Sequence, residues 1–149
     1  MAHEFLTKRV AKATFDATGG KAIGAYGTGL RLPKGAIVTD CFYNVRTTFT
    51  TANDSGTIAL HVQSANDIKA AIAISAAGDV WDAGLRCGLL GSPAVGSDAS
   101  TLNAGTALLY TAKKAASLLL LTASREVTVT VAVQDLTAGV MDIYVEYVV

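Results

Sequence analysis

Apolar and polar residues alternate with a period of two near the end of the chain. The alternation runs from residue 127 to 134 and again from 141 to 149, with a short turn containing Gly139 between them. This pattern is typical of strands that bury one face, and glycine suits the left-handed position of a three- to five-residue hairpin loop. The sequence therefore predicts an antiparallel hairpin whose second strand ends the chain inside a sheet.

A second pair of strands is predicted upstream. Residues 36–50 are dense in β-branched and aromatic side chains, which suit a pleated surface. Pro33 and Gly35 mark the start of this strand, because proline lacks the N–H that a central strand needs. Residues 52–56 read Ala-Asn-Asp-Ser-Gly, which is turn chemistry, and residues 57–62 form another short apolar run. These segments predict a second hairpin.

Two segments leave alternatives open. Residues 68–90 are rich in alanine and fit either a strand pair or a short helix. Residues 106–121 place leucine and alanine at helical spacing, but they also fit two short buried strands around a Lys113-Lys114 turn, which the β-rich surroundings favour. The run 91–100 reads as a surface loop. With about eight strands, the chain predicts an all-β fold, an antiparallel two-sheet sandwich that is jelly-roll-like.

Charge is unevenly distributed along the chain. Residues 1–35 hold six basic residues against Glu4 and Asp16, an excess of four positive charges. Residues 36–149 hold the other six basic residues against ten acidic ones, an excess of four negative charges. The first segment is also rich in glycine, alanine and threonine, so it buries little by itself.

This composition predicts an extended N-terminal arm over residues 1–29 that becomes ordered on a partner, followed by a β-sandwich domain over residues 30–149. A frayed basic terminus explains the same composition. Within the arm, the basic residues Lys8, Arg9 and Lys12 are the candidate contacts with a partner surface.

The overall composition excludes several classes of protein. Twelve Lys and Arg balance twelve Asp and Glu, whereas a nucleic-acid binder usually has a basic excess. Charged residues make up 16% and hydrophobic residues 51% of the chain, which favours a homo-oligomer or a subunit of a larger assembly. No stretch approaches the ~18 apolar residues of a membrane span, and no secretory signal follows the basic N-terminus. We expect no nucleic-acid or membrane partner.

Candidate catalytic chemistry is sparse. The histidines are His3 and His61, and a dyad of His61 with Cys41 or Cys87 is conceivable. No motif supplies the group that would orient such a dyad, so a structural histidine is the simpler interpretation. The two cysteines lie 46 positions apart without a CxxC spacing, which favours free thiols over a disulfide framework or a zinc site.

The most suggestive local group is Asp79, Trp81 and Asp82. The indole ring offers a stacking surface for a sugar and the carboxylates offer acceptors for its hydroxyls, although Trp is more often a core anchor. Neither this group nor Asn53-Asp54 has the further oxygen ligands of a calcium loop, and the latter pair is typical of a turn. We therefore expect no metal, no cofactor and no enzymatic activity.

Several segments resemble small structural proteins of tailed-phage virions, of the capsid decoration or cement type. The resemblance covers residues 30–149 and lies in five motifs: LPKGAIVT at residues 32–39, TTF at 47–49, TIAL at 57–60, LTAG at 136–139 and YVV at 147–149. These motifs mark turns and strand ends, and they carry no catalytic residue.

The resemblance implies a β-sandwich that decorates and stabilises the capsid shell, often as a homotrimer at threefold or quasi-threefold positions. It implies the major capsid protein as the partner, the capsid surface of the virion as the location, and the host cytoplasm as the place of synthesis. The alternative is a head-fibre or tail-associated adhesive module that binds carbohydrate through Asp79, Trp81 and Asp82.

Overall fold

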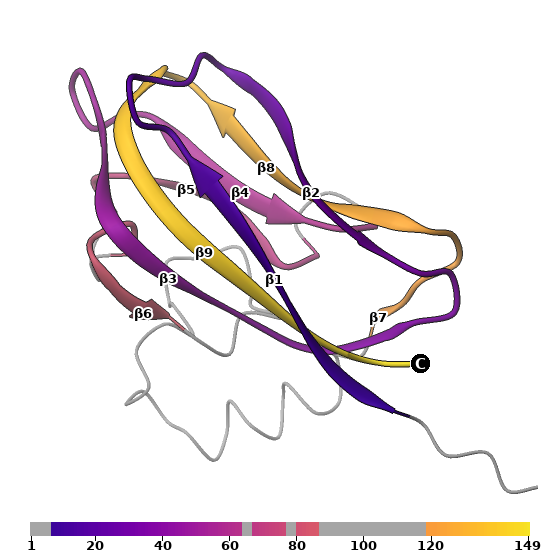
Figure 1. The fold of residues 1–149 in the computed structure, drawn as a ribbon. Coiled ribbons are helices and arrows are strands. Elements are labelled where there is room, and N and C mark those ends of the chain that lie inside the picture. Colours follow the sequence, from indigo (N-terminus) through magenta and orange to yellow (C-terminus); the bar gives the residue numbers. More distant parts are fainter. Residues whose placement is uncertain (1–6, 64–66, 77–79, 87–118) are drawn as a thin grey trace, which may run out of the picture.

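The chain folds into a sandwich of two β-sheets (Figure 1). The computed structural model describes residues 7–63, 67–76, 80–86 and 119–149. Within these ranges every regular element is a strand, as predicted from the alternation, and no helix is long and apolar enough to cross a membrane. The strands are β1 (Lys8–Asp16), β2 (Gly24–Leu32), β3 (Ile37–Thr51), β4 (Thr57–His61), β5 (Lys69–Ala73), β6 (Gly84–Arg86), β7 (Leu119–Leu120), β8 (Arg125–Ala132) and β9 (Leu136–Val148).

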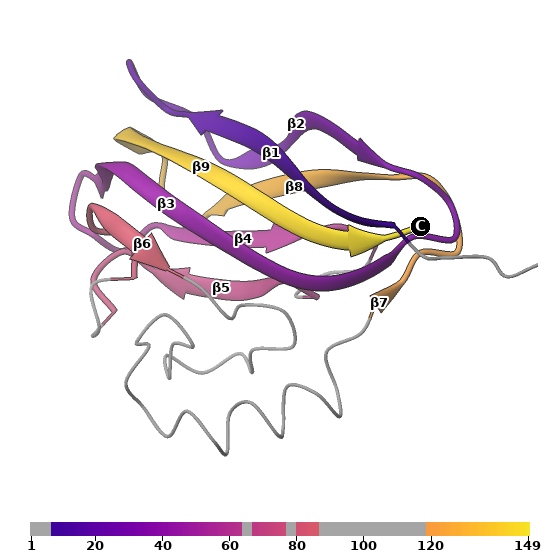
Figure 2. The same ribbon diagram turned by 60° about the horizontal axis from the view of Figure 1, so that its bottom comes forward.

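Long strands that are adjacent in sequence mostly lie in different sheets. One sheet has the order β1-β9-β3-β6, with β7 also pairing with β3, and the other has the order β2-β8-β4-β5. We call them the β9 sheet and the β8 sheet, after a central strand of each. All strand pairs are antiparallel, and the strands of one layer overlie those of the other in the view of Figure 2.

Both predicted hairpins are wrong in their pairing, although all four strands are present. β3 belongs to the β9 sheet and β4 to the β8 sheet, and β8 and β9 are likewise in different sheets. β9 is flanked by β1 and β3, while β8 is flanked by β2 and β4, so neither has a free edge for the other. Alternation reports that one face of a strand is buried, and it is silent about which strand lies alongside.

The segment predicted to be an arm contributes a strand to each sheet. β1 pairs with β9 over nine residues, and β2 pairs with β8. Phe15 and Leu32 are buried in the common core, and the backbone of Lys21 pairs with that of Leu136. The boundary predicted between residues 29 and 30 therefore falls inside β2. This segment has few apolar residues, but pairing with β9 and β8 places them against the common core.

The predictions for the middle of the chain are tested only in part. Within 68–90, the described residues 68–76 and 80–86 contain β5 and β6 and no helix, and the two strands lie in different sheets. Residues 119–120 form β7, and the rest of 106–121 lies outside the described residues, as does the predicted loop 91–100.

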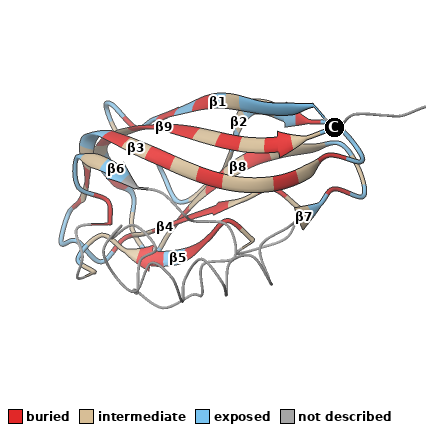
Figure 3. Ribbon diagram, turned by 90° about the horizontal axis from the view of Figure 1, so that it is seen from below, coloured by how far each residue is buried: buried red, intermediate tan, exposed pale blue. Residues whose placement is uncertain are grey.

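The core lies between the sheets and contains a cluster of aromatic rings. The rings of Phe15 and Phe49 stack with their centroids 6.0 Å apart, and the ring of Tyr43 stacks on that of Trp81 at 5.3 Å. Buried and less buried residues alternate along β3 and β9 in Figure 3, as expected for strands with one face on the core. Gly139 has a φ of 134° and a Cβ there would run into the Phe49 ring, so this position requires glycine.

Candidate interaction surface

A buried carboxylate organises the outer face of the β9 sheet. Asp142 on β9 is 4% exposed although it faces away from the core. Its Oδ2 lies 3.2 Å from Lys12 Nζ on β1 and 3.1 Å from Arg46 Nε on β3, and its Oδ1 accepts a hydrogen bond of 2.7 Å from the Thr14 hydroxyl. One side chain thus ties three neighbouring strands together.

The surroundings of Asp142 hold it in the ionised form. Burial alone would raise the pKa of this carboxyl, because it removes water from the charge. The hydrogen bond from Thr14 and the positive charges of Lys12 and Arg46 outweigh burial, so the pKa lies below its ordinary value. The fixed negative charge keeps both cations in place on the sheet surface.

A second ion pair lies four residues further along β9. Lys8 Nζ is 3.0 Å from Glu146 Oε2, and the Thr39 hydroxyl donates a 2.8 Å hydrogen bond to Glu146 Oε1. The acidic side chain again lies between a residue of β1 and a residue of β3. Charged groups on this face therefore form a fixed pattern across the sheet.

Two aromatic rings fill the space between these polar groups. Phe42 on β3 and Tyr144 on β9 face each other across the strands and stack with centroids 4.8 Å apart and planes 9° apart. Lys12 Nζ lies 5.8 Å from the centre of the Tyr144 ring, a cation–π distance. Both rings are half-buried, so apolar surface remains accessible between paired charges. Such a combination is typical of protein interfaces, where aromatic residues are enriched.

The outer face of the β8 sheet is chemically different. The register places Thr128, Thr130 and Ala132 of β8 on that face, with Ala59 and His61 of β4 as their neighbours. These are small side chains apart from His61, and they offer no stacked rings. Of the two outer faces, that of the β9 sheet carries the chemistry of recognition.

The predicted contact residues Lys8, Arg9 and Lys12 all lie on β1, where they are exposed. The structure brings them together on an edge strand of the β9 sheet. Lys8 and Lys12 are held by Glu146 and Asp142, while Arg9 makes no ion pair with any residue that the structure describes.

The predicted sugar-binding group is not assembled as a surface. Trp81 is 1% exposed, and its Nε1 donates a 3.1 Å hydrogen bond to the carbonyl of Ile72. The ring of Tyr43 stacks on it and Phe49 meets it edge-on. Asp82 is exposed, and Asp79 lies outside the described residues. Trp81 is a core anchor, because its ring is covered and its polar atom is satisfied inside the protein.

The other candidates are not brought together either. Cys41 is fully buried in the core of the β9 sheet, whereas His61 lies on the outer face of the β8 sheet, so the two do not form a dyad. His3 and Cys87 lie outside the described residues. Asn53 Oδ1 accepts hydrogen bonds from the backbone N–H and hydroxyl of Ser55, which is a turn. No metal-binding group of His, Cys, Asp or Glu occurs among the described residues.

The roles of Asp142 and of the Phe42–Tyr144 pair were not predicted from the sequence. Alternation alone places Asp142 and Tyr144 on the polar side of the last strand, which was predicted correctly. The contacts depend on the register of β9 between β1 and β3, which the assumed hairpin concealed. Phe42 gives a weak signal, because it is a large apolar residue on the outward side of its strand.

No protein-family model matches the chain, and no curated protein matches it in sequence. Its structure, however, is similar to chains of two virus capsids. One belongs to the "Acidic stable capsid structure of Helicobacter pylori bacteriophage KHP30", with a TM-score of 0.58, 14% identity, and coverage of 95% of this chain and 87% of that chain. The other belongs to the "Cyanophage Pam1 capsid asymmetric unit", with a TM-score of 0.57, 18% identity, and coverage of 100% and 90%.

The chain shares its fold with a component of each phage capsid. The likeness extends over nearly the whole length of all three chains. At 14% and 18% identity it concerns the path of the backbone and not individual side chains.

Proposed function

We propose that the chain is a non-enzymatic structural protein of a phage virion that decorates the capsid shell and stabilises it through contacts between subunits. The major capsid protein is the partner, the capsid surface is the site of action, and the chain is made in the host cytoplasm. The observation that carries the proposal is the likeness in fold, over 95% and 100% of the chain, to components of two phage capsids.

The strand order supports a jelly-roll topology as part of this proposal. Read in parallel, β1-β9-β3-β6 and β2-β8-β4-β5 match position by position: β1 with β2, β9 with β8, β3 with β4 and β6 with β5. Two Greek keys folded together produce this order, and jelly rolls built from them are common in viral capsids.

The outer face of the β9 sheet fits the role of the shell-binding surface. Its charged side chains are already paired in the free protein, so docking does not require them to lose further freedom. The Phe42–Tyr144 stack supplies apolar contact area at its centre. Lys8 and Lys12 extend this surface to the edge of the sheet, and the exposed Arg9 lies at the end of the same strand with its side chain on the opposite side. These three residues make the edge basic, which complements an acidic shell.

Assembly as a homotrimer at threefold positions of the shell belongs to the same proposal. Twelve positive and twelve negative charges leave no net repulsion between copies. Light scattering on a sizing column over a concentration series measures this directly. A trimer is expected as the smallest species at every concentration, and a constant monomeric mass would contradict this part of the proposal.

The direct test is add-back to virions assembled without the chain. Purified protein is incubated with these particles and sedimented, and the heat resistance of the particles is measured. We expect the wild-type protein to co-sediment at a saturating copy number and to raise the temperature at which the particles release DNA. Phe42→Ala should reduce occupancy at least tenfold, whereas Thr130→Ala on the opposite outer face should bind as the wild type does.

Two results would overturn the proposal. One is a wild-type protein that remains in the supernatant at all concentrations. The other is full occupancy without any change in heat resistance, which would separate attachment from stabilisation.

A further inference from the structure

The edges of the two sheets differ in how far they are protected against another strand. β6 has three residues and β5 has five, and β2 is interrupted by a register shift between Gly27 and Arg31. β1 is nine residues long and pairs with β9 without a register shift. Short or bulged edges resist further pairing, so β1 is the edge best suited to accept a strand.

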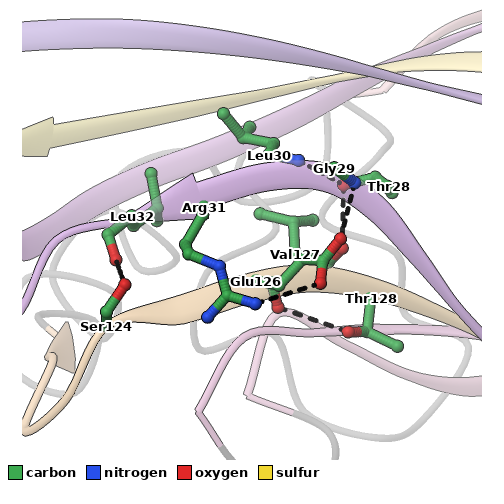
Figure 4. A network of polar contacts seen from close by, with 9 residues as sticks. All are labelled: Thr28, Gly29, Leu30, Arg31, Leu32, Ser124, Glu126, Val127 and Thr128. Atoms are coloured by element: carbon green, nitrogen blue, oxygen red, sulfur yellow. Dashed lines mark hydrogen bonds and ion pairs between the residues drawn. The ribbon is translucent and has the colours of Figure 1, made fainter.

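The bulge in β2 is closed by the side chain of Glu126, as Figure 4 shows. Its Oε1 accepts a 2.7 Å hydrogen bond from the backbone N–H of Gly29, and its Oε2 lies 3.6 Å from Arg31 Nη2. A Cβ on Gly27 would lie 2.6 Å from the same carboxylate, so glycine is needed for the side chain to lie there. β2 is thus capped by a neighbouring strand of its own sheet.

The backbone of β1 has no comparable cap. Thr7 and Val149 exchange hydrogen bonds of 3.1 and 3.2 Å, which places odd-numbered residues of β1 in the hydrogen-bonded pairs with β9. The even-numbered residues then direct their N–H and C=O groups away from β9: Lys8, Val10, Lys12, Thr14 and Asp16. Among the described residues none accepts or donates a bond to these outward groups.

We propose that this edge binds a second copy of the chain, β1 against β1 in antiparallel orientation, so that the β9 sheets of two molecules become continuous. The inference does not depend on attachment to a capsid. If the chain decorates a shell as trimers, the same contact would join neighbouring trimers across twofold axes.

The sequence of β1 is complementary to itself in this orientation. In the register that overlaps the whole strand, the twofold axis passes beside Lys12, and Lys8 of each copy faces Asp16 of the other. Two opposite-charge pairs then flank the centre, and Val10 faces Thr14. This register also places the two Lys12 side chains opposite each other. A shift by four residues one way places Lys8 opposite Lys12 twice, and the same shift the other way pairs Lys12 with Asp16 but overlaps only residues 12–16. The register centred on Lys12 therefore combines the longest overlap with two opposite-charge pairs.

Lysines on an edge often prevent strands from pairing, but here their charges are compensated within the molecule. Lys8 lies 3.0 Å from Glu146 and Lys12 lies 3.2 Å from Asp142. The two Lys12 side chains at the twofold axis therefore each bring their own carboxylate. Val10, which is 56% exposed between Lys8 and Lys12, is covered by Thr14 of the second copy when the strands pair.

A proline at position 10 is the sharpest probe. The N–H of Val10 points away from β9, so Val10→Pro removes an outward donor and leaves the β1–β9 hydrogen bonds intact, as edge prolines do. Val10→Thr keeps the donor and is the matched control. In sedimentation equilibrium the masses of the wild-type and Val10→Thr proteins should rise with concentration to at least twice that of Val10→Pro, whose mass should stay constant. The mass of Val10→Pro reports the proposed trimer separately, because it is the unit that β1 would join.

Cross-linking tests the register independently. In a chain carrying Cys87→Ser, Lys12→Cys places two thiols across the twofold axis, with Cα atoms about 5.5 Å apart, within disulfide range. Val10→Cys and Thr14→Cys would each lie more than ~13 Å from their own symmetry mate. Mild oxidation should therefore cross-link Lys12→Cys alone, and an equimolar mixture of the other two should form the mixed dimer. Cys41 is buried and does not compete.

Equal masses for the wild-type protein and Val10→Pro, when circular dichroism shows both folded, would overturn the inference. So would cross-linking of Lys12→Cys that is no faster than that of the two single-cysteine controls.

Discussion

The two outer faces of the sandwich share a backbone geometry and differ in what their side chains do. The β9 sheet presents a buried carboxylate with two cations, a second ion pair and a stacked aromatic pair. The β8 sheet presents mainly threonine and alanine, with one ion pair between Arg31 and Glu126. Both strands at the centre show the same alternation of apolar and polar residues in sequence. The chemistry of an outward-facing position is therefore set by its neighbours on adjacent strands.

The largest effect is expected from a deletion that takes a strand from each sheet. Removing residues 1–29 removes β1 and most of β2, and with them Phe15 from the aromatic core and the caps on both central strands. We expect loss of the folded state, seen as the absence of a cooperative melting transition by circular dichroism. Removing residues 1–6 is the control and should preserve the transition. If the protein without residues 1–29 still folds, these residues are not required for the fold and the prediction of an N-terminal arm is supported.

Next in size is the loss of the carboxylate that joins three strands. Asp142→Ala leaves Lys12, Arg46 and Thr14 without their common partner, and the free energy of unfolding should fall by about 2–3 kcal/mol. Asp142→Asn retains an acceptor for Thr14 and should lose less. Urea denaturation measures both changes. A change below about 0.5 kcal/mol in Asp142→Ala would show that the cluster is only a solvated surface feature.

The aromatic pair should contribute less to stability and more to binding. Phe42→Ala removes one ring of the stack and should lower the free energy of unfolding by about 1–2 kcal/mol, since both rings are half-buried. The matched change Thr130→Ala on the other face should have little effect. If both substitutions weaken attachment to the shell equally, the outer face of the β9 sheet is not the specific binding surface.

The pH dependence of the free energy of unfolding should show whether Asp142 stabilises the fold through its negative charge. The pKa of Asp142 is lowered in the folded protein, so its ionised form stabilises the fold at pH values above the ordinary carboxyl range. This contribution is lost as the pH falls through the lowered pKa. The difference in unfolding free energy between wild type and Asp142→Asn should therefore be largest near neutrality and shrink in acid. A difference that does not vary with pH would show that the ionised charge is not what stabilises this site.

The smallest change is expected at the ion pair of the β8 sheet. Glu126→Gln keeps an oxygen that accepts the Gly29 N–H and loses only the attraction to exposed Arg31, 3.6 Å away. The free energy of unfolding should change by less than about 0.5 kcal/mol. Thermal melts at low and high salt measure this. If Glu126→Gln lowers the free energy of unfolding as much as Asp142→Ala does, the ion pairs of the two sheets contribute equally to stability.

The strands with strict alternation could be predicted from sequence, and their partners could not. Residues 127–134 and 141–149 both have one apolar side, and this is enough to identify β8 and β9. A turn with Gly139 suggested a hairpin, but that glycine lies within β9, where its φ and the nearby Phe49 ring require it. Local turn residues therefore could not distinguish a hairpin from a crossing between sheets.

The N-terminal strands and the polar cluster were hidden for a related reason. β2 contains Gly24, Gly27 and Gly29, a composition that predicts little burial. Its stability comes from pairing with β8, about a hundred residues away in sequence. In the same way, the sequence predicted Lys12 as a contact with a partner, whereas in the fold it forms an ion pair with Asp142. Contacts between distant residues decide both cases, and periodicity does not report them.

The central place of β9 has a consequence for the order in which the molecule becomes complete. β9 separates β1 from β3, so neither has that neighbour until residues 136–148 have left the ribosome. All strands of the β8 sheet, which are β2, β4, β5 and β8, are synthesised before β9, so that sheet has its full set of strands first. A nascent chain that stalls before residue 136 therefore exposes unpaired strands on one layer only, and this layer is where chaperones and premature self-association would act.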